Sequence, residues 1–262
     1  MATKQALTIG INAYVPSRLA LRPCRNDATD LSNSLRSMGF QVQNDLDLNL
    51  KSMQSATRQF VNSIQPGAIV LFYFSGHGVQ CNGENYLIPT NAVGVHANNI
   101  KSTTIDAQSL VDSMYQRRPR LIICILDCCR TQAPVRPLDA FPSPNRALAG
   151  TNPGLAPMRT PPSTIIAYAC RANDTASAQS KNGRNSLYTY HLLRHIKTPN
   201  EDIETLLKRV GTDVQRESNN QQVPYRYSSC NERIYLMSNQ RQRVPVGGQF
   251  LQPKPAIRML FL

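Results

Sequence analysis

Two short polar runs, each placed directly after an apolar run, contain the residue types that thiol chemistry needs. The first is Ser75-Gly76-His77-Gly78, and the second is Asp127-Cys128-Cys129-Arg130. A free thiol, with a pKa of about 8.5, is only a few per cent thiolate at pH 7, so it needs a nearby base or a polarised substrate. His77 lies between two glycines, which leave it uncrowded, and it precedes Cys129 by 52 residues. These residues predict nucleophilic catalysis by a cysteine that a histidine assists.

Apolar runs and helical patterns alternate along the chain and predict the elements that position these two runs. The predicted strands are 6–10, 40–43, 68–74, 121–126, 164–169 and 233–236. The predicted helices are one capped by Asn26 or Asp27 and ending at Gly39, and then 53–64, 105–116, 186–196 and 202–217. Strands that alternate with helices predict an α/β fold with right-handed crossovers. Ligands bind such sheets beyond the carboxyl ends of the strands, where both polar runs lie.

The alternation stops at Thr131, and from there to Ser163 the chain contains eight of its 18 prolines. Such a stretch predicts a mobile linker or long loop. The chain therefore divides into residues 1–130, the linker 131–163, and residues 164–237, which complete the same domain. Residues 238–262 are predicted to form a flexible basic tail.

The composition limits the class of protein. A chain of 262 residues is long enough for one large domain or two small ones, and 41% hydrophobic residues exclude disorder throughout. No run approaches the roughly 18 apolar residues that span a bilayer, and no secretory signal follows Met1, so no membrane association is expected. Seven cysteines, two of them adjacent, favour a reducing compartment, and we predict a cytoplasmic protein.

The charge balance is strongly basic, with 29 Lys and Arg against 16 Asp and Glu and a net charge of +13. Such a balance could indicate nucleic-acid binding. The basic residues between Arg130 and Lys197, however, are spread singly through the linker and a loop rather than gathered in a patch. The sequence therefore predicts no specific nucleic-acid partner.

The two polar runs, together with several other segments, resemble caspase-like cysteine peptidases of family C14, of the paracaspase and metacaspase type. The resemblance covers about residues 5–237 apart from the linker. The matching segments are Ala6–Tyr14, Arg25–Ala28, Tyr73–Gly78, Asn85–Pro89, Leu126–Arg130, Gly183–Thr189 and Gln222–Tyr225. The resemblance implies a caspase-like three-layer sandwich, α/β in class, with a mostly parallel central sheet and helices on both faces. Residues 1–130 would match the large subunit and residues 164–237 the small one.

The resemblance also implies catalytic roles. It selects Cys129 rather than Cys128 as the nucleophile, because the family's cysteine is third in an acid–x–Cys–basic run. His77 would assist the attack and protonate the leaving amine. The backbone N–H groups of Gly78 and Cys129 would surround the developing oxyanion.

The implied specificity follows from acidic residues. Paracaspases and metacaspases have acids at the positions of Asp27 and Asp127, and these two carboxylates would attract a basic P1 side chain. Cleavage of protein or peptide substrates after Arg, and also Lys, is implied. A third acid of the paracaspase pocket aligns with Thr175, beside Asp174, so Asp174 is the remaining candidate. Thr131 is a second departure, because caspases have glycine after the arginine.

Several residues also have simpler interpretations. Asp27 could cap a helix, and Arg184-Asn185-Ser186 could simply open one. Cys124 and Cys128 are expected to be packing residues, and the other cysteines lack metal-ligand spacing. His191 and His195 are four residues apart, but the metalloprotease glutamate is absent, so they are expected on a surface or in a groove.

Other functions and partners stay open. A catalytically silent caspase-like scaffold and an Asp-specific caspase are the alternatives, although Asp127 would repel an acidic P1 group. A nucleotide-binding domain is disfavoured, because no phosphate-binding glycine motif follows the first strand. No cofactor is predicted to be required, but many metacaspases need calcium, and no acidic cluster here indicates a calcium site. A dimer is left open, and Arg136, Arg146 and Arg159 are predicted sites of self-cleavage.

Overall fold

A central sheet organises the protein. The computed structural model describes residues 2–15, 17–129, 151–152, 155–170 and 180–238. The main strands lie side by side in the order β2-β1-β3-β6-β8-β9, and only β9 runs antiparallel to its neighbour. Their bounds are β1 (Lys4–Gly10), β2 (Gln41–Leu46), β3 (Ile69–Cys81), β6 (Leu121–Cys129), β8 (Thr164–Tyr168) and β9 (Tyr225–Ser228). This arrangement confirms the predicted mostly parallel α/β sheet.

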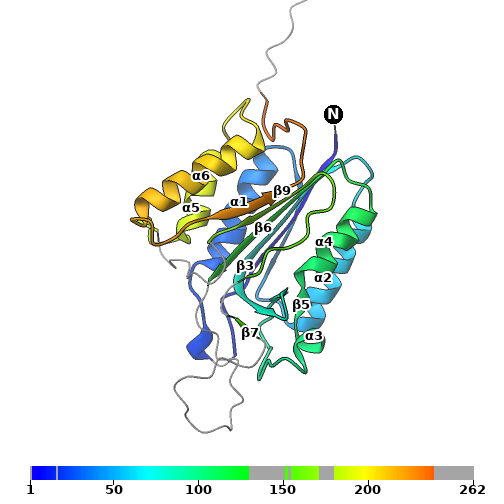
Figure 1. Ribbon diagram of the computed structural model, residues 1–262, viewed down its shortest axis with the longest axis vertical. Coiled ribbons are helices and arrows are strands. Elements are labelled where there is room, and N and C mark those ends of the chain that lie inside the picture. Colours follow the sequence, from blue (N-terminus) through cyan, green and yellow to red (C-terminus); the bar gives the residue numbers. More distant parts are fainter. Residues whose placement is uncertain (1, 16, 130–150, 153–154, 171–179, 239–262) are drawn as a thin grey trace, which may run out of the picture.

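Helices cover both faces of the sheet, as Figure 1 shows. One face carries α1 (Cys24–Ser37), α5 (Leu187–His195) and α6 (Ile203–Glu217), and the other carries α2 (Leu50–Ser63) and α4 (Ala107–Gln116). Successive residues of the central strands point to opposite faces. Phe72 therefore packs with the α2 and α4 side chains, whereas Leu71 and Tyr73 pack with those of α1, α5 and α6. Because both faces are covered, the strands are continuously apolar.

Polar side chains define where most of the longer helices begin. Asn49, Asp106, Ser186 and Asp202 each accept hydrogen bonds from backbone N–H groups of the first turn of α2, α4, α5 and α6. Two further short elements are the 3-10 turn η1 (Ser17–Leu19) and α3 (Ile100–Thr103).

Helix α1 departs from this pattern. It begins at Cys24, and the preceding Pro23 offers no side-chain cap. The prediction that Asn26 or Asp27 caps it is therefore wrong. Asp27 lies instead in the first turn and is fully buried.

Strand β3 extends beyond the predicted end of its apolar run. Gly78–Cys81 pairs antiparallel with β4 (Glu84–Leu87), and β4 pairs with β5 (Ile105–Asp106). The turn consists of Asn82 and Gly83, both at positive φ (52° and 79°), which is the geometry of a tight two-residue hairpin. His77 therefore lies where β3 leaves the parallel sheet and enters this hairpin.

The end of the predicted linker is packed rather than free. Residues of β7 (Thr151–Asn152) pair with the end of β3, and Leu155 and Met158 are buried in the core. The Asn85 side chain exchanges two hydrogen bonds with the backbone of Ala156. Residues 131–150 of the linker, like residues 239–262 of the predicted tail, lie outside the described residues.

The predicted strand at 233–236 is not a strand. Its one ladder contact is an isolated bridge between Tyr235 and Asp202, and its buried Ile234 and Leu236 pack with α6. The sheet ends with β9 instead. Within the described ranges, no helix is both long and apolar enough to cross a membrane.

Candidate active site

The structure places His77 and Cys129 next to each other on neighbouring parallel strands. The register of β3 and β6 aligns Ser75 with Asp127, Gly76 with Cys128, and His77 with Cys129. For Cys129 it is the backbone position that is described. The two polar runs recognised in the sequence thus meet at the carboxyl ends of the two central strands.

A backbone carbonyl holds the His77 ring. The ring is almost fully buried, and its Nε2 atom lies 2.7 Å from the carbonyl oxygen of Leu19, in η1. A carbonyl oxygen can only accept a hydrogen bond, so Nε2 carries the hydrogen of the neutral ring. Nδ1 is then the nitrogen that can take up a proton. Sequence reasoning missed Leu19, because its contribution is a backbone atom that any residue would supply.

Tyr14 is a second residue that the sequence did not single out. Its hydroxyl accepts a hydrogen bond from the backbone N–H of His77 (2.7 Å) and donates to the carbonyl of Ile88 (3.3 Å). Its ring centroid lies 4.4 Å from that of His77. A Cβ atom on Gly76 would come within 2.5 Å of the Tyr14 hydroxyl, so glycine is needed at 76 for this contact. Tyr14 therefore fixes both the backbone and the ring of His77.

Gly78 and Cys128 form a close packing contact behind the site. A Cβ atom on Gly78 would meet the Cys128 sulfur at 2.8 Å and Leu155 at 3.1 Å. Cys128 and Cys124 are both buried on the sheet face that packs against α2 and α4, which confirms them as packing residues. Burial raises the pKa of the Cys124 thiol to about 12.

Asp27 and Asp127 come together beneath the α5 N-terminus, and both are almost completely buried. Asp27 accepts hydrogen bonds from the hydroxyl of Ser75 (3.1 Å) and the backbone N–H of Ser186 (3.0 Å). Asp127 Oδ2 accepts from the hydroxyls of Ser186 (2.5 Å) and Thr189 (2.7 Å). The Arg184-Asn185-Ser186 run does open a helix, as expected, and its last residue also contacts both acids.

The two carboxylates are electrostatically unsatisfied. Burial raises the pKa of Asp27 well above its usual range, and the negative charge of Asp127 raises it further. Burial also raises the pKa of Asp127, although the hydroxyls of Ser186 and Thr189 oppose this effect. Among the described residues, no Lys, Arg or His forms an ion pair with either acid. Such a pair is suited to receive a cation.

The predicted residues outside the central sheet fall into two groups. Asp174 and Thr175, like Arg136 and Arg146, lie outside the described residues. Arg159 is described: its side chain is exposed and pairs with Asp112, while its backbone N–H donates to Gln108 (2.9 Å). In the part of the chain that the structure describes, no three His, Cys, Asp or Glu side chains are arranged to hold a metal ion.

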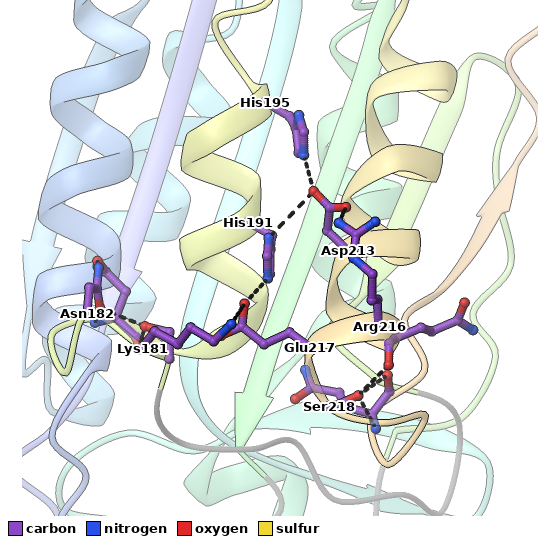
Figure 2. Close-up of polar contacts among 12 residues, drawn as sticks. Lys181, Asn182, His191, His195, Asp213, Arg216, Glu217 and Ser218 are labelled. Atoms are coloured by element: carbon purple, nitrogen blue, oxygen red, sulfur yellow. Dashed lines mark hydrogen bonds and ion pairs between the residues drawn. The ribbon is translucent and has the colours of Figure 1, made fainter.

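His191 and His195 are not surface residues, so that expectation is wrong. Both are buried between α5 and α6, where they face acidic side chains (Figure 2). His195 Nε2 lies 2.7 Å from Asp213 Oδ2, and His191 Nε2 lies 3.1 Å from Glu217 Oε2. This His–acid cluster ties α5 to α6. Its acids are four residues apart on α6, as the histidines are on α5, so the matching spacing was the available sequence signal.

The Peptidase_C14 caspase-domain family model matches residues 3–235. The mucosa-associated lymphoid tissue lymphoma translocation protein 1 of Homo sapiens is 28% identical over 127 residues, which are 48% of this chain and 15% of that protein. Metacaspase-1 of Mycosarcoma maydis is 35% identical over 88 residues, which are 29% of this chain and 22% of that protein. The matched regions are thus a small part of these relatives.

Two solved structures share the fold over nearly the whole chain. A structure of pro-sf-caspase-1 superposes with a TM-score of 0.63 at 16% identity and covers 91% of this chain and 92% of that one. Caspase-1 from Spodoptera frugiperda gives 0.61 at 17% identity and covers 92% of both chains. The three-layer arrangement predicted from the sequence is thus confirmed.

Proposed function

The chain belongs to the caspase-domain family of peptidases, C14, and from this premise we propose that it is a cysteine endopeptidase that cleaves after arginine or lysine. One observation supports this proposal above the others. His77, with its ring held by Leu19, lies in register with Cys129 and beside a buried pair of acids that has no described counter-ion. The nucleophile, the proton carrier and a cation-binding pocket would then share one edge of the sheet.

In the proposed reaction, the Cys129 sulfur attacks the scissile carbonyl carbon. His77 takes the thiol proton at Nδ1 and delivers it to the leaving amine as the C–N bond breaks, which leaves a thioester. His77 then removes a proton from water, the resulting hydroxide attacks the thioester, and the acid product departs as the thiol is regenerated. The N–H groups of Gly78 and Cys129 would stabilise each oxyanion, and one such donor is typically worth about 3–4 kcal/mol.

Asp27 and Asp127 would select the P1 residue. A guanidinium or ammonium group would supply a positive charge that no described residue provides to these carboxylates, whereas an acidic P1 group would be repelled. This electrostatic argument favours basic specificity over the Asp-specific alternative. No step of the proposed chemistry passes through a metal, and calcium enters only as a condition of the assay below.

Self-cleavage in the linker belongs to the same proposal. At Arg159 the Asp112 and Gln108 contacts would have to be released before its backbone could enter an active site. We therefore expect little cleavage at Arg159 while these contacts persist, and cleavage at Arg136 and Arg146 stays a prediction from the sequence. Intact-mass spectrometry of an active preparation tests this, and a product ending at Arg159 alone would contradict it. The oligomeric state, for which the sequence leaves a dimer open, would be measured by sedimentation.

The decisive experiment is hydrolysis of matched peptides that differ only in having Arg, Lys or Asp at P1, with and without calcium. We expect Arg and Lys cleavage, and we expect Cys129→Ala to reduce it at least about a thousandfold because the nucleophile is lost. Cys128→Ala is the matched control and should keep measurable cleavage. Cleavage after Asp would contradict the pocket. A folded, silent wild-type protein under every condition would favour the scaffold alternative.

A further inference from the structure

Ser186 is a single buried residue that forms hydrogen bonds with both pocket carboxylates and also caps a helix. Its hydroxyl accepts the backbone N–H of Thr189 (3.1 Å), which caps α5, and donates to Asp127 Oδ2 (2.5 Å). Its own backbone N–H donates to Asp27 Oδ1 (3.0 Å). Ser186 is 2% exposed. The two acids, from α1 and β6, are therefore held relative to one another through the N-cap residue of a third element, α5.

A chain of hydroxyl groups completes the set of donors. Thr189 donates to Asp127 Oδ2 (2.7 Å), so its oxygen accepts the hydrogen bond that Tyr73 offers at 2.6 Å. Burial, followed by the charges of Asp27 and Asp127, raises the pKa of Tyr73 well above its usual value, which keeps this donor protonated. Every one of these donors leads to the same oxygen of Asp127.

The other oxygen of Asp127 is different. Oδ1 is buried and has no hydrogen-bond partner among the residues that the structure describes. A buried carboxylate oxygen without a donor is costly, so proteins rarely retain one without a reason. Asp127 Oδ1 is therefore the atom at which a ligand could supply a hydrogen-bond donor.

We propose that Ser186 is the positioning residue of the P1 pocket: together with Thr189 it occupies Asp127 Oδ2, fixes Asp27 beside it, and leaves Asp127 Oδ1 as the acceptor for a cationic P1 side chain. This inference rests on the proposed function. It adds a specificity-determining residue, the N-cap of α5, to the acids that the sequence indicated. Among the described side chains, Ser186 forms its hydrogen bonds with Asp27, Asp127 and the α5 cap rather than with His77, so it should govern binding of the P1 group rather than the chemical step.

The first test is steady-state kinetics on peptides with Arg or citrulline at P1, which differ in charge and little in shape. Ser186→Ala and Thr189→Val should each raise KM for the Arg peptide by about tenfold or more, with kcat within about twofold, because a buried hydrogen bond to a charged group is lost. Ser186→Thr, which keeps the hydroxyl, should restore most of the KM. The preference for Arg over citrulline should shrink in Ser186→Ala and Thr189→Val and should be mostly retained in Ser186→Thr.

A matched control separates the effect of Ser186 on the P1 pocket from its effect as a helix cap. Asn49→Ala removes the N-cap of α2, whose side chain accepts the Ser52 N–H (2.9 Å), and should cost comparable stability. It should leave KM for the Arg peptide unchanged. If Ser186→Ala is folded and its KM is also unchanged, or if both peptides are affected equally, the inference is overturned.

A binding measurement keeps the inference separate from catalysis. In the Cys129→Ala background, calorimetry with the uncleaved Arg peptide should show binding that weakens about tenfold or more on adding Ser186→Ala. Binding that depends on Ser186, in a wild type without peptidase activity, would refute the proposed function and support the pocket. Absence of both activity and binding would overturn both proposals.

Discussion

Two acidic clusters contact the same helix, α5, and they are built in opposite ways. At its N-terminus, Asp27 and Asp127 receive hydrogen bonds from hydroxyl and backbone groups. Farther along, Asp213 and Glu217 face histidines, and their other contacts are with Arg216 and Lys181 (Figure 2). Among the described residues, the first cluster has no positively charged partner, whereas the second cluster has Arg216 and Lys181 as partners.

The pKa shifts record this difference. Burial raises the pKa of Asp27 and of Asp127, and hydrogen bonds do not overcome it. Burial acts in the same direction on Asp213, but the His195 hydrogen bond and the charge of Arg216 outweigh it, and the net pKa is lowered. Internal partners thus distinguish an acid that stabilises helix packing from an acid that waits for a ligand.

The largest expected effect comes from removing one charge in each cluster. Asp127→Asn should lower kcat/KM for the Arg peptide by about a hundredfold or more, because the buried cation loses its partner. It should also raise the free energy of unfolding by about 1–2 kcal/mol, since a buried uncompensated charge disappears. Enzyme kinetics and urea unfolding measure the two quantities.

Asp213→Asn is the matched variant, and its effects on stability and activity should be opposite to those of Asp127→Asn. We expect lower stability and a kcat/KM within about twofold of the wild type, because Asp213 contacts α5 histidines and not the pocket. Loss of activity in both variants with equal loss of stability would remove the distinction between the clusters.

The next effect concerns the His–acid cluster alone. His191→Ala should lower the free energy of unfolding by about 2 kcal/mol, because Glu217 loses a buried partner and a cavity forms. His191→Gln, which can still donate, should recover part of this loss. Activity per folded molecule should be unchanged in both, and a large drop in kcat with normal stability would contradict a structural role.

The free energy of unfolding should change with pH in opposite directions for the two clusters. The raised pKa values of Asp27 and Asp127 mean that the folded state binds more protons than the unfolded chain, so stability falls as pH rises above about 4. Burial lowers the pKa of His191, which the charges of Glu217 and Asp213 only partly oppose, so stability falls as pH drops below about 6.5.

Urea unfolding between pH 4.5 and 8 checks this prediction. Asp127→Asn should flatten the decline toward high pH, and His191→Gln should flatten the decline toward low pH. Identical profiles for both variants and the wild type would mean that neither cluster titrates as argued.

The sequence predicted the parts of the site that lie on continuous, apolar strands. The runs ending near His77 and Cys129 are apolar because both sheet faces are covered. The sequence therefore predicted where these strands end and that His77 and Cys129 lie close together. The hairpin beyond His77 also has a local sequence signal, because Asn82-Gly83 is a strong turn pair.

Other features depend on contacts that no local pattern encodes. The carbonyl of Leu19 is a backbone group, so no residue type in the sequence indicates its role. The short, largely exposed β9 forms because it pairs with the edge of β8. The matching four-residue spacing of the histidines and acids is visible in the sequence, but the pairing of His191 with Glu217 requires α6 to pack against α5. Ser186 was recognised as a helix start, but its contacts with Asp27 and Asp127 require the fold.

The smallest effect is expected at a third acid near the same helix, which extends the comparison to the surface. Arg184 binds Asp30 through two hydrogen bonds of 2.8 Å each, and the hydrogen bond from Arg184 is the main reason that the pKa of Asp30 is lowered. Arg184→Ala should bring that pKa back toward its ordinary value in an NMR titration. Because the arginine side chain is about half exposed, stability should fall by only about 0.5–1 kcal/mol. KM for the Arg peptide should stay within about twofold, since Arg184 is two residues from Ser186 but bonds to neither pocket acid. A KM change as large as that of Ser186→Ala would mean that the whole segment before α5, and not the Ser186 hydroxyl, sets the pocket.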